Sequence, residues 1–120
     1  HQTFRSKKTK ENFLWEIAKS ELEAKYEILG TDEVIAQFQR MAILKAIDEN
    51  WVEQVDYLQQ LRMALSGQYT SQKNPLVEFF QEAYQSFERM KEAAKEQMVR
   101  NLLLSRVEIN KKGEIVLHFP

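Results

Sequence analysis

The sequence predicts a mainly α-helical fold: a long antiparallel helical hairpin plus one N-terminal helix, with a short C-terminal β-hairpin or strand. Three observations lead to this prediction. Only three glycines and two prolines occur among the 120 residues, so few positions interrupt a helix. Apolar residues recur at three- and four-residue spacing over most of the chain. After residue 106 the spacing changes to the alternation that is typical of strands.

The first predicted helix covers residues 9–29 and ends at Gly30, because glycine adopts the left-handed conformation at a helix C-terminus without steric cost. The residues on or near its apolar stripe are Phe13, Ile17, Ala24 and Ile28. A basic cluster precedes this helix. We interpret the cluster as a solvated lead-in, although phosphate contact is an alternative; it consists of Arg5, Lys7, Lys8 and Lys10.

The second predicted helix begins after Thr31, whose hydroxyl suits an N-cap, and ends near Leu65. Asp32 and Glu33 lie in its first turn, where the helix dipole favours anions. At 1.5 Å per residue the helix would be roughly 50 Å long. Its apolar residues follow the alternation of three and four that is typical of a coiled-coil seam. The seam consists of Leu44, Ile47, Trp51, Gln54, Leu58, Leu61 and Leu65.

The third predicted helix begins with Asn74 as N-cap and Pro75 at the first helical position. Its stripe consists of Leu76, Phe80, Ala83, Phe87, Met90 and Ala94. Two such stripes joined by a short connection predict an antiparallel helical hairpin. Four further apolar residues widen the second stripe: Phe79, Met98, Leu102 and Leu103. We therefore expect another surface to cover this hairpin in a longer parent protein.

The C-terminal residues alternate between apolar and polar on both sides of the turn-forming segment 110–113. The apolar members are Val107, Ile109, Ile115, Leu117 and Phe119. This pattern predicts a short β-hairpin, or one strand that joins another sheet. Since an isolated two-stranded hairpin is barely stable in water, the segment needs a surface to dock on.

Composition excludes several kinds of chemistry. The absence of cysteine removes disulfides, thiolate zinc sites and cysteine nucleophiles, and no glycine-rich phosphate loop occurs. A net charge of −1 gives no general attraction to nucleic acid. The two histidines, His1 and His118, lie at opposite ends without metal-ligand spacing. An acidic cluster is interpreted as solvated helix surface: Asp48, Glu49, Glu53 and Asp56. We predict no catalytic, cofactor or metal site in this chain.

The segment between the two long helices, residues 66–74, carries hydroxyls, amides and one aromatic ring. It can be a simple polar turn. It can also be a contact site, because a phenol and amides meet polypeptide of any sequence through apolar contact and hydrogen bonds to the backbone. The candidate contact residues are Gln68, Tyr69, Thr70 and Ser71.

Residues 43–90 carry a recognisable series of motifs: Asp48 with Trp51, Leu61-Arg62, Gln72, Asn74-Pro75 and Glu78-Phe79. This series resembles the C-terminal region of SecA, the bacterial preprotein translocase ATPase, and aligns with it without a gap from Trp51 to Pro75. The tyrosine at the family's contact tip falls on Thr70, with Tyr69 beside it, and Ser71 replaces a glycine. Such departures resemble the accessory SecA of some Gram-positive bacteria.

The resemblance implies a division of the chain into three parts. Residues 1–30 would be the end of the helical wing domain, residues 31–105 the two-helix finger of the helical scaffold domain, and residues 106–120 a C-terminal strand or linker segment. The tip of the finger would contact a SecY-type channel and the exported preprotein.

The resemblance also implies a function. The chain would be a C-terminal fragment of an ATP-driven export motor, located in the cytoplasm and peripherally at the inner face of the membrane. ATP and magnesium would bind in the rest of the SecA motor, since this chain lacks nucleotide-binding motifs and is itself expected to be non-catalytic. The alternative is a helical protein-interaction adaptor without motor activity, which would bind partner helices through its apolar stripe.

Overall fold

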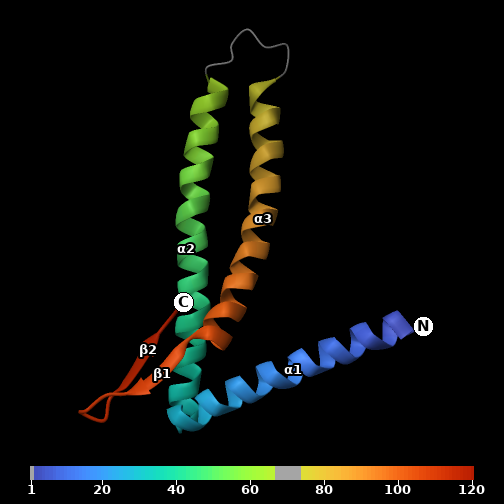
Figure 1. Ribbon diagram of the computed structural model, residues 1–120. Coiled ribbons are helices and arrows are strands. Elements are labelled where there is room, and N and C mark those ends of the chain that lie inside the picture. Colours follow the sequence, from blue (N-terminus) through green and yellow to red (C-terminus); the bar gives the residue numbers. More distant parts are fainter. Residues whose placement is uncertain (1, 67–73) are drawn as a thin grey trace. The chain divides into compact units, whose positions relative to one another are not determined.

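The computed structural model describes residues 2–66 and 74–120. Three helices and two strands follow one another along the chain (Figure 1). They are α1 (Gln2–Leu29), α2 (Asp32–Ser66), α3 (Pro75–Leu104), β1 (Arg106–Ile109) and β2 (Ile115–His118). The predicted mainly α-helical fold is confirmed, and the C-terminal segment forms a β-hairpin rather than a lone strand.

The end of α1 and the starts of α2 and α3 lie where the sequence predicts them, because each has a local capping contact. Gly30 has a φ of +87°, and its N–H donates to the Tyr26 carbonyl at 2.9 Å. The Thr31 hydroxyl accepts from the Val34 N–H at 3.3 Å. The Asn74 side-chain oxygen accepts from the Leu76 N–H at 3.0 Å, which caps α3 in the predicted way.

The start of α1 differs from the prediction. The helix begins at Gln2 instead of Thr9, so the basic cluster lies within the helix and not before it. No glycine or proline precedes residue 9, and lysine, arginine and glutamine are good helix formers. The side chains of Lys7, Lys8 and Lys10 are exposed.

The chain forms two compact units. The first consists of His1–Ala42 and Arg100–Pro120, and the second of Ile43–Val99. Helices α2 and α3 each contribute to both units. The division into three parts implied by the family resemblance concerns the organisation of a longer protein and stays a prediction.

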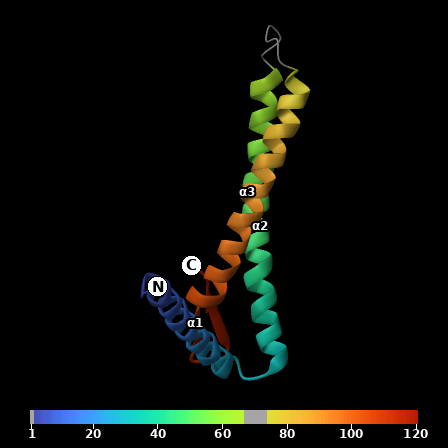
Figure 2. The ribbon, with the colours of Figure 1, turned by 90° about the vertical axis from the view of Figure 1, so that its right-hand side faces the viewer.

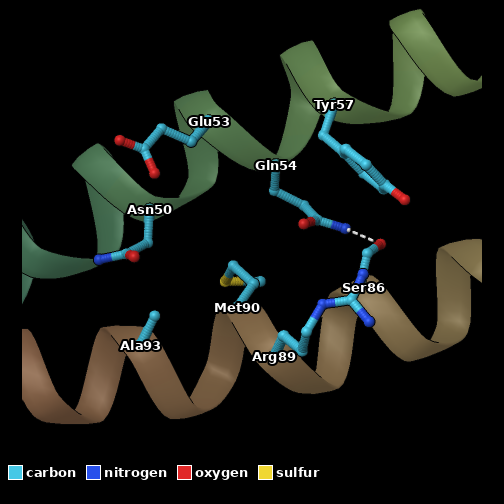
Figure 3. A pocket seen from close by; sticks show the side chains of 8 residues that line it. All are labelled: Asn50, Glu53, Gln54, Tyr57, Ser86, Arg89, Met90 and Ala93. Atoms are coloured by element: carbon cyan, nitrogen blue, oxygen red, sulfur yellow. Dashed lines mark hydrogen bonds between the residues drawn. The ribbon is translucent and has the colours of Figure 1, made fainter.

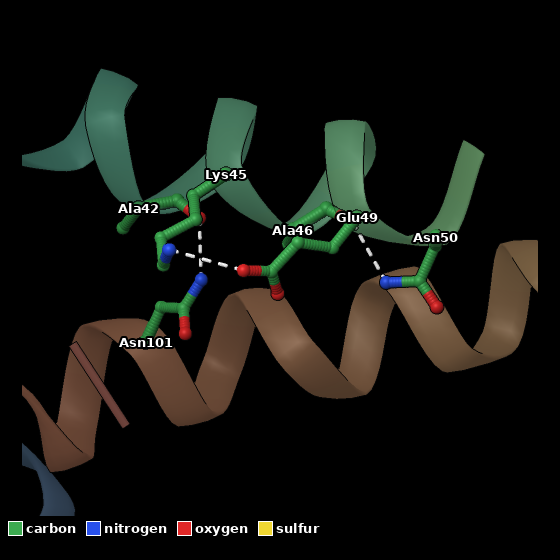
Figure 4. A network of polar contacts seen from close by, with 6 residues as sticks. All are labelled: Ala42, Lys45, Ala46, Glu49, Asn50 and Asn101. Carbon is green, nitrogen blue, oxygen red and sulfur yellow. Dashed lines mark hydrogen bonds and ion pairs between the residues drawn. The ribbon is translucent and has the colours of Figure 1, made fainter. Parts of the chain in front are cut away.

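The first unit has its core where α2 meets the β-hairpin. Phe38 is only 1% exposed, and its ring stacks on Phe119 with the ring centres 6.2 Å apart. The strands pair antiparallel with Arg106 opposite His118, and β1 contacts α1. The Asn101 amide, fully buried, donates to the Ala42 carbonyl at 2.9 Å (Figure 4). The predicted need of the β-hairpin for a docking surface is thus met within this unit.

The stripe predicted for α1 is wrong in its phase. Phe13 is 66% exposed and Ile17 and Ile28 are also exposed, whereas Lys25 and Leu29 are buried. Because the charged Lys25 lies at the centre of the packed face, the spacing of apolar residues in the sequence does not indicate which face of α1 is packed.

The buried Lys25 caps a different helix. Its Nζ donates to the carbonyls of Leu102, at 3.1 Å, and of Leu103. These carbonyls end α3, which has no basic residue in its own last turn. Burial lowers the pKa of Lys25, and the charge of Glu21 opposes part of this shift.

We expect this lowered pKa to make the chain more stable as the pH rises. Between the folded pKa of Lys25 and its ordinary value of 10.5, the unfolded chain binds more protons than the folded chain. The free energy of unfolding should therefore rise with pH in this window, and the rise should be absent from a Lys25→Met chain. Urea unfolding of both chains from neutral pH to about 10.5 measures the difference. Parallel pH profiles would contradict the assignment.

In the second unit, α2 and α3 run antiparallel and lie side by side in both Figure 1 and Figure 2. The predicted hairpin is confirmed. Its seam is confirmed only in the half nearer the connection, where Gln54 is buried and Leu58, Leu61 and Leu65 are half-buried.

The other half of the α2 seam was predicted wrongly. Leu44, Ile47 and Trp51 are exposed, Trp51 to 51%. The buried position is instead Ala46, and Asn50 is half-buried. A small residue and an amide carry too little hydrophobicity to outweigh the larger apolar residues on the neighbouring face, so the pattern followed the wrong stripe.

Helix α3 shows the same mixture. Ala94 is buried, Ala83 and Met90 are half-buried as predicted, and the predicted stripe residues Leu76, Phe80 and Phe87 are exposed. Ser86, which the stripe omits, is 4% exposed. The hairpin therefore keeps large apolar side chains on its surface. Such exposure is what we expect if another part of a longer protein covers the hairpin.

Candidate functional site

The predicted contact residues Gln68, Tyr69, Thr70 and Ser71 lie outside the residues that the structure describes. The structure describes the two helix ends that flank them. The Ser66 hydroxyl donates to the Met63 carbonyl at 2.9 Å in the last turn of α2. Asn74 caps the first turn of α3. The segment therefore connects two well-formed helix ends.

A small apolar pocket of about 290 Å³ lies between these helix ends. It is lined by Arg62, Leu65, Ser66, Pro75, Leu76 and Phe79. Apolar side chains supply most of the lining, and one guanidinium lies among them. Such a pocket can hold an apolar side chain of another polypeptide. In the sequence, this pocket is indicated only by the apolar residues directly before and after the polar connecting segment.

A second, polar pocket of about 360 Å³ lies midway along the hairpin (Figure 3). It is lined by Asn50, Glu53, Gln54, Tyr57, Ser86, Arg89, Met90 and Ala93. The Gln54 amide Nε2 donates to the Ser86 hydroxyl at 2.8 Å, across the two helices. That hydroxyl in turn donates to the Ala83 carbonyl at 2.8 Å. In the sequence, Gln54 stands out only as a polar member of the seam, and nothing singles out Ser86.

The outer faces of the hairpin carry ion pairs within single helices. Lys45 lies 3.0 Å from Glu49 on α2 (Figure 4), and Lys91 lies 3.0 Å from Glu88 on α3. The hydrogen bond and charge of Glu88 raise the pKa of Lys91. Exposed pairs such as these contribute little to stability, and they keep the outer faces hydrated.

The acidic cluster of α2 is solvated surface, as predicted. Asp48, Glu49, Glu53 and Asp56 are all exposed; Glu49 is paired with Lys45, and Asp56 accepts from Gln60 at 2.9 Å. Among residues 2–66 and 74–120, no three potential metal ligands come together. His118 lies in β2 with its Nε2 3.5 Å from a carboxylate oxygen of Glu108. No helix in the described part of the chain has the length and apolarity to cross a membrane.

These features define a class of protein: a helical scaffold in which two long helices pair antiparallel and meet at a short connecting segment. Residues 2–106 match the family model of the SecA Wing and Scaffold domain. The chain belongs to this family, which confirms the resemblance to SecA.

Several relatives carry the same name, "Protein translocase subunit SecA 2". The chain is 60% identical over 107 residues to the one from Streptococcus sanguinis (strain SK36), a match that covers 89% of this chain and 14% of the relative. It is 59% identical over 115 residues to the one from Streptococcus gordonii, which covers 96% and 14%. The identity is 40% over 94 residues for Staphylococcus epidermidis (strain ATCC 35984 / DSM 28319 / BCRC 17069 / CCUG 31568 / BM 3577 / RP62A), covering 78% and 12%.

These names agree with the accessory type of SecA that the departures from the family pattern indicated. The chain spans about 14% of the length of the streptococcal relatives, so most of each relative has no counterpart in it. No solved structure matches the chain.

Proposed function

We propose that this chain is the wing and scaffold part of a SecA-type protein-export motor, in which the α2–α3 hairpin contacts the channel and the exported polypeptide. The observation that carries the proposal is the family match over residues 2–106. The names of the relatives, as protein translocase subunits, support an export role. ATP and magnesium would bind in parts of the motor outside this chain, because the sequence contains no phosphate-binding loop.

The hairpin suits a mechanical role. Helix α2 has 35 residues and α3 has 30, and the second unit pairs them side by side. Paired helices bend less than a loop of equal span, so a displacement at one end of the hairpin would be carried to the other end. Contact with channel and substrate would be made by the connecting segment, through Gln68, Tyr69, Thr70 and Ser71.

The small apolar pocket supports this choice of contact site. Leu65, Leu76 and Phe79 line it directly beside the connecting segment. An exported chain that reached the segment would find an apolar site for one of its side chains close by, without any requirement for sequence. In this role the protein would work at the cytoplasmic face of the membrane, attached peripherally to a SecY-type channel and to the rest of the motor.

Photocrosslinking in the full-length parent motor tests the proposal. A photoreactive phenylalanine analogue at position 69 should crosslink to the channel and to an exported chain arrested in transit. The matched control replaces Tyr84, which is 68% exposed on α3 and does not line either pocket. Equal yields at the two positions, or none at either, would reject the tip contact.

Loss of the tip side chains should slow export. We expect the double variant Tyr69→Ala with Thr70→Ala to lower the translocation rate of the parent motor several-fold, because apolar and hydrogen-bonding contacts to the exported chain are both removed. The variant Tyr84→Ala serves as control and should translocate normally. If the double variant exports at the unaltered rate in a vesicle assay, the segment is only a turn.

The adaptor alternative is favoured by one observation, the large apolar side chains on the outside of the hairpin. Leu44, Trp51 and Phe80 are between 49% and 61% exposed. An adaptor could bind partner helices there without any motor. The gene decides between the two: a motor gene extends several hundred residues upstream and encodes a Walker A motif, while an adaptor gene encodes roughly this chain alone.

A further inference from the structure

We propose that the polar pocket midway along the hairpin binds the main chain of an extended polypeptide segment, which rests on the proposed function and adds a second contact with the exported chain. The pocket lies within the second unit and is formed by facing turns of α2 and α3 (Figure 3). The residues that the structure assigns to its lining lie within α2 and α3.

The floor of the pocket holds an amide whose oxygen is open to the pocket. Gln54 is only 6% exposed, and its Nε2 is committed to the Ser86 hydroxyl. No hydrogen bond joins its Oε1 to any residue in the described part of the chain. In the described part of the chain the buried side-chain oxygen or nitrogen without a partner is the Ser105 hydroxyl, so Oε1 of Gln54 is accessible to solvent. Because the Ser86 bond holds the amide in one orientation, Oε1 is a fixed acceptor that a ligand N–H can reach.

The rim supplies donors. The guanidinium of Arg89 has five N–H donors, and the hydroxyl of Tyr57 has one. Within residues 2–66 and 74–120, neither side chain makes a hydrogen bond or an ion pair. Figure 3 shows the Tyr57 ring directed from α2 toward α3, on the side of the pocket where Arg89 lies.

The charges of the lining select a neutral ligand. Glu53 and Arg89 line the same pocket, so an anionic ligand meets a carboxylate and a cationic ligand meets a guanidinium. A peptide group is neutral and has one N–H donor and one C=O acceptor. It matches the Gln54 acceptor and the Arg89 and Tyr57 donors together, while Met90 and Ala93 provide apolar contact.

The size of the pocket fits a short stretch of chain. About 360 Å³ is at the lower end of the range of ~300–1,000 Å³ for small-ligand sites, so a folded domain cannot enter. A site that binds the main chain of a peptide does not depend on the peptide's side chains. It can therefore accept exported chains of many different sequences.

The first test uses the full-length parent motor with a photoreactive phenylalanine analogue at position 57, which removes the Tyr57 hydroxyl and leaves Gln54 and Arg89 to hold the peptide group. The control position is Tyr84, which lies two residues before Ser86 and so on the far side of α3. The probes are a neutral synthetic peptide, a scrambled copy, and a copy N-methylated at its central amides. We expect crosslinks from position 57 with the first two peptides, a loss with the methylated one, and little crosslinking from position 84.

The second test changes the donor. Arg89→Met should lower the peptide crosslink from position 57 about tenfold or more, since a hydrogen bond from a charged group is lost. Arg100→Met, on the same helix outside the pocket, should leave it unchanged. Helical content measured by circular dichroism checks that both variants fold.

Three results would overturn the proposal: equal crosslinks from positions 57 and 84, binding that depends on peptide sequence, or full binding of the methylated peptide. Crosslinks of an exported chain to position 69 are measured in the same motor. If they persist while the pocket tests fail, the proposed function stands and only the second contact is rejected.

Discussion

Replacing Phe38 with alanine is expected to lower the free energy of unfolding of the first unit by about 3–5 kcal/mol. Phe38 is 1% exposed, and Phe119 stacks on its ring. The substitution removes the buried ring and leaves a cavity. Few other apolar residues are buried in this unit, Leu29 and Ala42 among them, so little can move in to fill the space. Denaturation by urea, followed by circular dichroism, measures the loss.

The control for this prediction is Phe80→Ala, which makes the same chemical change on the surface. Phe80 is 61% exposed, and a surface substitution of this kind usually changes stability by about 0.5 kcal/mol or less. A similar loss in the two variants would mean that Phe38 is not the centre of the core. A loss confined to Phe38→Ala would also show that the β-hairpin is held by this ring, because Phe119 directly follows β2.

The second large effect is expected at the buried pair in the hairpin. Ser86→Ala removes the partner that the Gln54 amide, 6% exposed, has among the described residues. A buried polar group left without its partner costs about 1–3 kcal/mol. The further change Gln54→Leu removes the unmet amide, so the double variant should recover most of the lost stability.

A double-mutant cycle separates these contributions. The free energies of unfolding of the two single variants and of the double variant give the coupling between residues 54 and 86. Ser66→Ala is the matched control, because the Ser66 hydroxyl is exposed and donates to the Met63 carbonyl of its own helix. Additive effects in the cycle would show that the two side chains do not stabilise each other.

The sequence predicted the elements of this fold well, because their boundaries depend on neighbouring residues. Gly30, Thr31 and Asn74 each act within one turn of the chain, and each forms the expected cap. The existence of the helical hairpin also followed from local spacing. What the sequence did not predict is the face along which the helices pack. In α2 that face passes through Ala46 and Asn50, and the larger apolar residues lie beside it.

The candidate site was predictable only in part. The polar connecting segment stood out from its composition, and its residues 68–71 lie outside the described part of the chain. The polar pocket was not foreseen, because a glutamine and a serine within apolar stripes look like interruptions until the fold brings them together. Lys25 shows the same limit: 77 positions separate it from its partner Leu102, and a lysine in a helix is ordinarily taken as surface.

The contact of Lys25 with the end of α3 has a consequence for the order in which the chain can fold. The last turn of α3 receives its closing hydrogen bonds only when a segment made much earlier in synthesis is in place. A truncated chain that began at Gly30 should therefore keep slow amide exchange in residues 75–99. It should lose that protection from residue 100 to the end of β2, in spite of keeping every residue of both strands.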